Sequence, residues 1–318
     1  MITTKNIHFT FVIILLLIAI TACSSNPNKN TDELSLSTAR YGHAVVNDGQ
    51  KIYVFAGGNK SGFLSDIEII EPTLEKTKVL PNKLIPRRYF SAVWDGEHSI
   101  YIIGGVSFEK KYYRFEPRVE IFNTITHEIS FAPPLPTPTR INTAVLLSGQ
   151  IYVFGGAYSV NNRLKASSEV TIFSIEENRW MQAAAMPTAK ATRAIVKDGE
   201  IYVVGGYNQT SSMNVFEKYD PKLNAWQTLP AMPVKISAHS LSLVKDTLFV
   251  FGNYNDLTSS YAYSFRTEQW KKVELGYQAS RHNAATTLGD TTYVIGGNLG
   301  RRGPFLDYVQ IFKLYQFN

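Results

Sequence analysis

The stretch Ile151-Tyr152-Val153-Phe154-Gly155-Gly156 decides the fold, because close copies of it recur along the chain. The other copies begin at Ile52, Ile100, Ile201, Leu248 and Thr292. Each copy is an apolar run that ends in glycine, as expected for a strand buried on both faces. The copies are spaced by about fifty residues, and a repeat of that size indicates a propeller or a solenoid.

Each copy lies inside a larger unit with four predicted antiparallel strands. A short strand such as Ala44-Val45-Val46 precedes it, joined by a tight turn such as Asn47-Asp48-Gly49. A variable loop follows the glycines and leads to a third strand. The six third strands are predicted at 67–70, 119–122, 170–173, 215–219, 261–265 and 309–312. A fourth strand follows, marked by Trp180, Trp226 and Trp270 in three units. This is the composition of a propeller blade.

The glycine pair, the preceding tyrosine and the spaced tryptophan resemble the kelch repeat. The resemblance implies an all-β, six-bladed β-propeller over residues 34–318, with four antiparallel strands per blade. The fifth unit departs from the pattern, with Asn253 in place of the second glycine. The sixth unit has room for only three strands. We therefore expect the segment 33–37 to complete the last blade as its fourth strand and to remove an open sheet edge.

The N-terminal residues read as a targeting segment. An apolar run from Phe9 to Ile20 is short for a membrane span and suits the core of a signal peptide. The sequence Ile20-Thr21-Ala22-Cys23 resembles the bacterial lipobox and contains the only cysteine of the chain. The resemblance implies a signal peptide over 1–22, a lipid on Cys23 and a polar tether over 23–33. It also implies anchoring in a bacterial cell envelope, at an outer membrane and facing the periplasm. A plain signal peptide or an uncleaved anchor is the alternative.

Composition narrows the class of protein further. The chain has 318 residues, of which 44% are hydrophobic, and this content excludes a disordered chain. The net charge is +6. In the four-stranded units, the loops into the first strands and after the glycines share one edge, which we call the first rim. Basic residues concentrate there and acidic residues on the opposite edge, so the charge is polarised. Nucleic acid is a poor partner for an exported lipoprotein, and we expect a monomer.

Five basic residues on the first rim are candidate ligand-binding residues. Arg40, Arg88, Arg140 and Arg281 each precede an alanine by four residues, and Lys190 takes that place in the fourth unit. Kelch propellers that bind acidic peptides use arginines at this position around a central opening, so the resemblance implies the same role here. The forked donors of guanidinium suit carboxylates. The alternative is that these residues only cap neighbouring loops.

Two loops after the glycines provide further candidates. The loop 106–117 carries Tyr112, Tyr113 and Arg114, and the third unit carries Arg163. Basic residues interleaved with aromatic ones can stack on sugars or on partner side chains. The sequence therefore predicts a surface for an acidic protein segment or an acidic glycan, unless these are ordinary solvated loops.

The sequence shows no recognisable catalytic motif. The glycine pairs lack the Lys-Ser/Thr of a phosphate-binding loop, and no pair of histidines has metal-ligand spacing. We therefore expect no cofactor and no metal. Some exported bacterial kelch proteins act as sialic-acid mutarotases (N-acetylneuraminate epimerases), and that resemblance implies a Glu just after the strand-ending glycine, which this chain lacks. A binding protein is the preferred interpretation, with such a sugar-processing enzyme as the alternative.

Overall fold

The computed structural model describes residues 34–109 and 111–314, and Leu34–Asn318 form one compact unit. The described part is all-β apart from one 3-10 turn at Pro72–Leu74, and every paired strand is antiparallel. The predicted all-β class and the repeated antiparallel units are confirmed. The predicted signal peptide, Cys23 and the tether lie outside the described residues.

Most strands belong to six sheets, one for each sequence repeat. Sheet one contains β1 (Ala44–Asn47), β2 (Ile52–Asn59), β3 (Gly62–Glu71) and β4 (Lys76–Leu80). Sheet two contains β6 (Ser91–Trp94), β7 (Ser99–Ile103), β10 (Val119–Asn123) and β11 (Ile129–Ala132). Sheet three contains β12 (Thr143–Leu147), β13 (Gln150–Phe154), β16 (Val170–Ser174) and β17 (Arg179–Gln182).

The remaining three sheets continue this order. Sheet four contains β18 (Ala191–Lys197), β19 (Glu200–Tyr207), β20 (Ser212–Asp220) and β21 (Ala225–Leu229). Sheet five contains β22 (Ser240–Val244), β23 (Thr247–Phe251), β24 (Ser260–Ser264) and β25 (Gln269–Lys272). Sheet six contains β26 (Ala284–Leu288), β27 (Thr291–Ile295) and β28 (Val309–Lys313).

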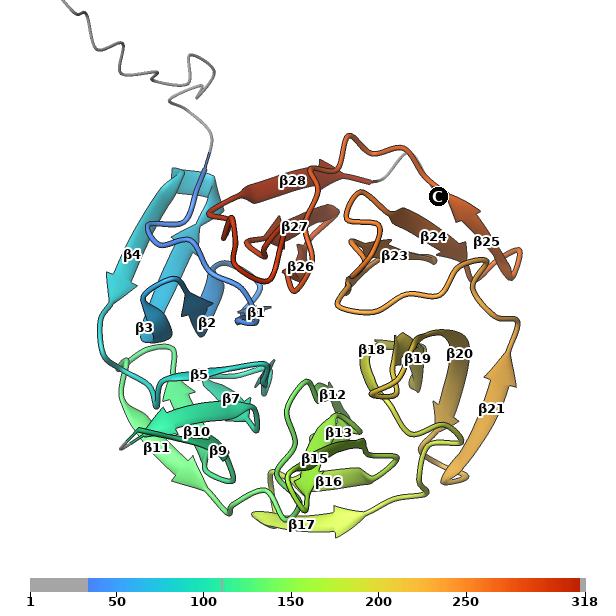
Figure 1. The fold of residues 1–318 in the computed structure, drawn as a ribbon, viewed down its shortest axis with the longest axis horizontal. Coiled ribbons are helices and arrows are strands. Elements are labelled where there is room, and N and C mark those ends of the chain that lie inside the picture. Colours follow the sequence, from blue (N-terminus) through green and yellow to red (C-terminus); the bar gives the residue numbers. More distant parts are fainter. Residues whose placement is uncertain (1–33, 110, 315–318) are drawn as a thin grey trace, which may run out of the picture. The chain divides into compact units, whose positions relative to one another are not determined.

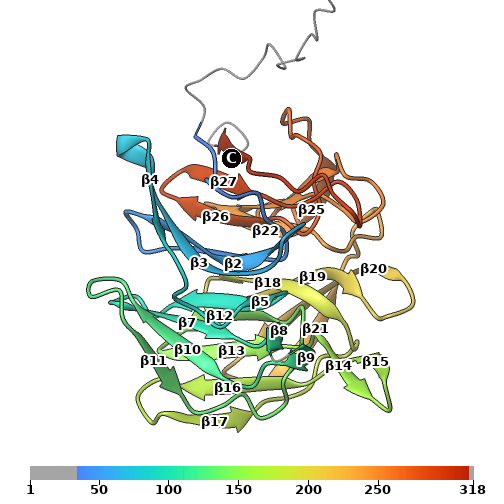
Figure 2. The ribbon, with the colours of Figure 1, turned by 60° about the vertical axis from the view of Figure 1, so that its left-hand side comes forward.

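The first strands of the six sheets surround a common axis. Each of β1, β6, β12, β18 and β22 contacts the first strand of the next sheet, and β26 contacts both β22 and β1 (Figure 1). The apolar second strands lie one step outward, and the turned view shows the faces of successive sheets packed on one another (Figure 2).

Each hydrophobic cluster lies between two successive sheets. One cluster combines Phe55 of β2 with Phe122 of β10, and another combines Ile52 of sheet one with Tyr293 and Ile295 of sheet six. Tryptophans of the fourth strands reinforce this packing, because the indole of Trp226 donates to the carbonyl of Ala184, which follows sheet three, at 2.9 Å. The apolar second strands are therefore buried on both faces, as their sequence predicted.

The sixth sheet has three strands within the described residues. The segment expected as its fourth strand lies beside it without forming a named strand. Ser35 forms an isolated antiparallel bridge to Tyr308, and the Leu36 amide donates to the Asp307 carbonyl at 2.8 Å. The rest of the segment 33–37 adds no further bridge to this edge within the described part of the chain, and Glu33 lies outside it.

Two loops after the glycines, expected as irregular, form hairpins. In unit three, β14 (Ala157–Val160) pairs with β15 (Arg163–Ala166). In unit two, β8 (Val106–Glu109) pairs with β9 (Tyr112–Phe115), and β8 also pairs with β5 (Arg87–Arg88). The alternation of polar and bulky residues in these loops is itself a weak indication of strands. No helix in the described part of the chain is long and apolar enough to cross a membrane.

Candidate functional site

The loops that lead into the first strands share one backbone arrangement. Residues Arg88, Arg140 and Arg281 pair with the residue after each glycine pair: Val106, Ala157 and Asn298. In sheet one this place belongs to Tyr41, which bridges to Gly58. The predicted shared register is therefore off by one residue at Arg40, because Ala44 corresponds to Ser91, not to Ala92.

Glycine is required where these loops cross the ends of the second strands. A Cβ on Gly105, whose φ is +91°, would lie 2.7 Å from the Phe90 Cβ and 2.9 Å from the Arg88 carbonyl oxygen. At Gly156 a Cβ would lie 2.7 Å from the Arg140 carbonyl oxygen. The repeated glycines thus let the arginine-bearing loops lie directly on the sheet.

Arg40 and Lys190, both predicted as ligand residues, are instead buried against carboxylates. The Arg40 guanidinium lies 2.7 Å from Asp66 and 3.4 Å from Glu68, and it donates to the Ala56 carbonyl at 2.9 Å. The Lys190 ammonium donates to Glu217 in the same way. Neither side chain is exposed, so these two residues join the loop to the third strand and leave no donor on the surface.

A chain of backbone hydrogen bonds joins the loops of neighbouring sheets. The residues that follow Tyr41, Arg88, Arg140 and Arg281 have a left-handed φ: Gly42 (+59°), Tyr89 (+61°), Ile141 (+56°) and His282 (+52°). Ala238 in the fifth unit has the same conformation (+57°). The amide of Ile141 donates to Tyr89, that of Tyr89 to Gly42, that of Gly42 to His282, and that of His282 to Ala238. Four of these five residues are not glycine, and the hydrogen bonds compensate for their uncommon conformation. The loops are therefore held at fixed positions around the axis.

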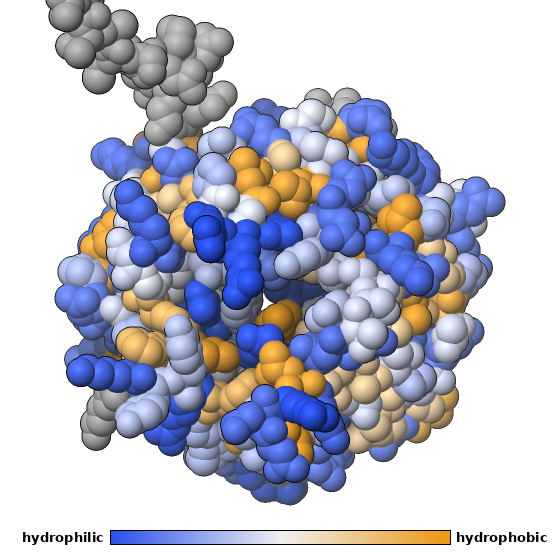
Figure 3. All heavy atoms as spheres, in the orientation of Figure 1, coloured by the Kyte–Doolittle hydropathy of each residue, from blue (hydrophilic) through white to orange (hydrophobic). Residues whose placement is uncertain are grey.

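Side chains of these loops form a cluster of arginine and aromatic residues, which we call the mouth. The mouth consists of Tyr41, Arg88, Tyr89, Arg140, Tyr254, Arg281, His282 and Phe305. Tyr41 stacks on Phe305 at a centroid distance of 5.1 Å, and Tyr89 meets His282 edge-on at 5.2 Å. Figure 3 shows a hollow at the centre of this part of the molecule with hydrophilic residues beside it.

Two mouth arginines are held by aromatic rings. The Arg88 guanidinium lies 4.4 Å from the Phe63 ring centroid and donates to the Tyr41 hydroxyl. The Arg281 guanidinium lies 4.0 Å from the Tyr254 ring and donates to the Tyr254 carbonyl at 2.9 Å. Stacking on rings orients a guanidinium without neutralising it. Both arginines therefore keep their positive charge; Arg88 is partly exposed, whereas Arg281 is buried, with 9% of its surface exposed.

The mouth is electrostatically positive. Among the described residues, no carboxylate lies within ion-pair distance of Arg88, Arg140 or Arg281. Burial lowers the pKa of Arg140, and the neighbouring charge of Arg88 lowers it further. Burial also lowers the pKa of His282 to about 3, with Arg281, Arg193, Arg140 and Arg88 adding to the effect, so His282 is neutral. The surplus charge is thus carried by arginine alone.

An aromatic patch extends outward from Arg88. Phe63 stacks on Phe108 at 6.0 Å, and Tyr113 lies 5.1 Å from Phe108 and 5.9 Å from Phe63. Of the predicted loop residues, the structure therefore brings Tyr113 next to a mouth arginine. Tyr112, which is 76% exposed, and the exposed Arg114 lie on the same hairpin without a ring contact to the patch. Arg163 is exposed at the start of β15.

Sequence reasoning missed the aromatic half of the mouth. Tyr41 and Tyr89 lie at or beside the arginine position of their units, and a comparison of residues next to that position could have found them. Tyr254 instead follows Gly252 and Asn253 in the fifth unit. Phe305 comes from far along the chain, and only the fold brings it to Tyr41. No group of three His, Cys, Asp or Glu side chains arranged to hold a metal ion occurs among residues 34–109 and 111–314.

Comparison with known proteins agrees with this architecture. Residues 42–253 match the family described as KLHDC2/KLHL20/DRC7 Kelch-repeats domain. The chain is similar to Kelch-like protein terF of Aspergillus terreus, with 24% identity over 73% of this chain and 56% of that protein. It is also similar to Beta-scruin of Limulus polyphemus, with 26% identity over 64% of this chain and 23% of that protein. Kelch-like protein 23 of Mus musculus is 26% identical over 68% of this chain and 37% of that protein.

The chain thus spans roughly a quarter to just over half of the length of these relatives. Its repeats, its antiparallel sheets and the family match agree with one another. The chain belongs to the kelch-repeat family.

Proposed function

We propose that residues 34–318 form a closed, six-bladed propeller that binds an acidic segment of another protein at the mouth. Closure is supported by the contact of β26 with β1 and by the cluster that joins Ile52 to Tyr293 and Ile295. The hydrogen bond from the Leu36 amide to the Asp307 carbonyl joins the N-terminal segment to the residues that precede β28. A closed ring would make the mouth a rigid surface with little ordering cost on binding.

One observation carries the binding proposal. Arg88, Arg140 and Arg281 converge on the mouth without a carboxylate partner among the described residues, while Arg40, Arg87 and Lys190 nearby are all paired with glutamate. Folding therefore pairs one set of basic residues with carboxylates and leaves the other set without a carboxylate partner. Unpaired guanidinium groups beside aromatic rings suit carboxylates on an extended segment.

The aromatic patch supports a peptide more than a free sugar acid. Phe63, Phe108 and Tyr113 continue the mouth outward from Arg88, which lengthens the surface beyond a single small ligand. An acidic segment with an apolar residue at one end would use both parts. The alternative ligand is an acidic glycan, which the interpretation as a sugar mutarotase also requires. The same binding experiment would reveal it.

We also propose that Cys23 carries a lipid and holds the propeller at a bacterial envelope membrane. The lipobox-like sequence supports this, and several acyl chains would anchor the protein stably. Expression of the full chain and of Cys23→Ser in a bacterium that processes lipoproteins tests it. The full chain should be recovered with the membranes and Cys23→Ser should not; equal recovery of the two would contradict the anchor.

The binding experiment uses the full chain and a fluorescent hexaglutamate peptide as the probe, with trigalacturonate as the sugar-acid probe. Binding should weaken as salt rises, because charges at a rim are screened. The double variant Arg88→Glu/Arg140→Glu should lose affinity for the peptide by more than about tenfold, since it reverses two of three guanidinium contacts. Unchanged peptide affinity in this variant would refute the role of the mouth.

The matched control reverses two arginines on the opposite rim, Arg179→Glu/Arg266→Glu. Arg179 begins β17 and Arg266 lies in the turn after β24, both away from the mouth in the strand order. Net charge changes equally in both double variants, so only a local effect separates them. Circular dichroism confirms folding of each, and Arg140→Met provides a milder variant. Binding of trigalacturonate but not of the peptide would favour the glycan instead.

A further inference from the structure

A cavity of about 140 Å³ lies on the common axis, bordered by the first strands of all six sheets. Its lining includes Ala44, Ser91, Thr143, Arg193, Ser240 and Ala284, one residue from each strand. These six residues are structurally equivalent, because each pairs with the last apolar residue before the glycines: Phe55, Ile103, Phe154, Val204, Phe251 and Ile295.

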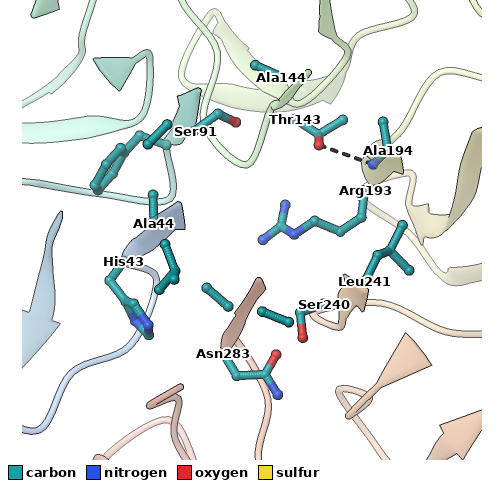
Figure 4. A pocket seen from close by; sticks show the side chains of 15 residues that line it. His43, Ala44, Ser91, Thr143, Ala144, Arg193, Ala194, Ser240, Leu241 and Asn283 are labelled. Carbon is teal, nitrogen blue, oxygen red and sulfur yellow. Dashed lines mark hydrogen bonds between the residues drawn. The ribbon is translucent and has the colours of Figure 1, made fainter. Parts of the chain in front are cut away.

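Five of the six equivalent residues are small, and the sixth is Arg193. The small side chains create the space, and the arginine extends into it from β18, as Figure 4 shows. A β-bulge between Ala191 and Arg193 shifts the register of β18 at this point. The place of Arg193 in the cavity follows from the arrangement of the first strands around the axis.

Arg193 has no anionic partner in the described structure. The lining of the cavity contains no carboxylate, and the recorded hydrogen bond of the guanidinium goes to the carbonyl of its own neighbour, Thr192, at 3.1 Å. Burial lowers the pKa of Arg193 to about 10, so the surroundings oppose its charge. The lining histidine, His43, does not add charge, because burial and the nearby Arg40 lower its pKa to about 3.

Other polar groups of the cavity also have unused hydrogen-bonding capacity. The Ser240 hydroxyl is buried without a hydrogen bond and can donate one. The Thr143 hydroxyl already accepts from the Ala194 amide at 3.2 Å, which leaves its own hydrogen to donate (Figure 4). The Asn283 carbonyl oxygen has no partner either and can accept from water in the cavity. Arg193 is half-buried, and a partly desolvated charge without compensation is costly, so such a site favours an anion.

We propose that this axial cavity is a binding site for a small inorganic monovalent anion such as chloride, held by the Arg193 guanidinium and the Ser240 and Thr143 hydroxyls. The volume fits such an ion with a few waters, since one water takes about 30 Å³ of liquid volume. The site is separate from the acidic partner proposed for the mouth. Its occupant would neutralise the centre of the ring.

The test measures the thermal unfolding midpoint of the full chain while chloride replaces gluconate at constant ionic strength. Gluconate is too large to enter with its hydration shell, so it serves as the reference anion. The midpoint of the wild type should rise saturably with chloride, by about 3 °C once chloride exceeds its dissociation constant tenfold. A midpoint that does not respond to chloride would overturn the proposal.

Arg193→Met removes the charge and keeps the length of the side chain. It should abolish the response to chloride, and in gluconate alone its midpoint should equal or exceed that of the wild type, because no uncompensated cation remains. Arg179→Met, which removes an exposed arginine, should respond as the wild type does. Equal responses in Arg193→Met and the wild type would place the ion elsewhere and refute the site.

A direct measurement keeps the proposal testable if Arg193→Met does not fold. Crystals of the wild type soaked in bromide should give an anomalous peak beside the Arg193 guanidinium. A cavity without such a peak would overturn the proposal. The double variant Arg88→Glu/Arg140→Glu should retain the chloride response, so failure at the mouth and failure in the cavity are distinguishable.

Discussion

The buried ion pair Arg87–Glu120 allows a quantitative test of what holds the loops that lead into the first strands. The Arg87 Nη2 lies 2.5 Å from the Glu120 Oε2, and the two side chains are 0% and 2% exposed. Glu120→Gln keeps the shape and an acceptor for the Ile85 amide, but it leaves Arg87 as an unpaired buried cation. Removing one partner of a buried pair costs about 3–5 kcal/mol.

The lower end of that range applies here, about 3 kcal/mol, because Arg87 also donates to the carbonyls of Gly104 and Arg118, at 3.1 and 3.2 Å. This corresponds to roughly a hundredfold change in the unfolding equilibrium constant. Urea unfolding at equilibrium measures it. A loss of less than about 1 kcal/mol would refute the reasoning, since exposed pairs give values of that size.

Two controls separate the buried charge from other effects. Glu177→Gln breaks the exposed pair with Arg179, whose side chains are 59% and 50% exposed, and should change the free energy of unfolding by no more than about 1 kcal/mol. Arg87→Met/Glu120→Leu removes both charges and should remain within about 1 kcal/mol of the wild type. Burial supports this expectation, because it raises the pKa of Glu120 and lowers that of Arg87.

Two further predictions concern the glycine pairs and the acidic pH range. Gly105→Ala should cost about 1–3 kcal/mol more than Gly96→Ala in urea unfolding, because both glycines have φ near +90° but a Cβ clashes only at Gly105; equal losses would show that strain alone matters. Burial opposes ionisation of Glu116, yet hydrogen bonds from Arg118 and Ser107 hold its pKa at about 2, below the ordinary 4.5. Its ionised form therefore contributes stability above about pH 4.5 that is lost as the pH falls toward 2. The difference in unfolding free energy between the wild type and Glu116→Gln should shrink from pH 6 to pH 3; a constant difference would contradict the role of its charge.

The repeat architecture could be predicted from the sequence because it depends on local patterns. Apolar runs ended by glycine, such as Ile151–Gly156, indicate strands buried on both faces wherever they occur. The third strands likewise lie where the sequence placed them: five fall within β3, β10, β16, β20 and β28, and the predicted strand 261–265 extends one residue past the end of β24. The hairpins β8–β9 and β14–β15 were missed, because short strands in loops leave a weak pattern.

The sequence by itself determined the antiparallel units and their repetition along the chain. Only the tertiary structure decided which basic residues are paired with a carboxylate. Arg40 and Lys190 are next to the mouth in sequence, yet their side chains turn inward to Glu68 and Glu217, whereas Arg88 and Arg281 stack on rings. A one-residue shift along a loop exchanges these two environments. The reason is physical: the partner that buries or exposes each arginine comes from a strand or a sheet elsewhere in the chain, which no local pattern encodes.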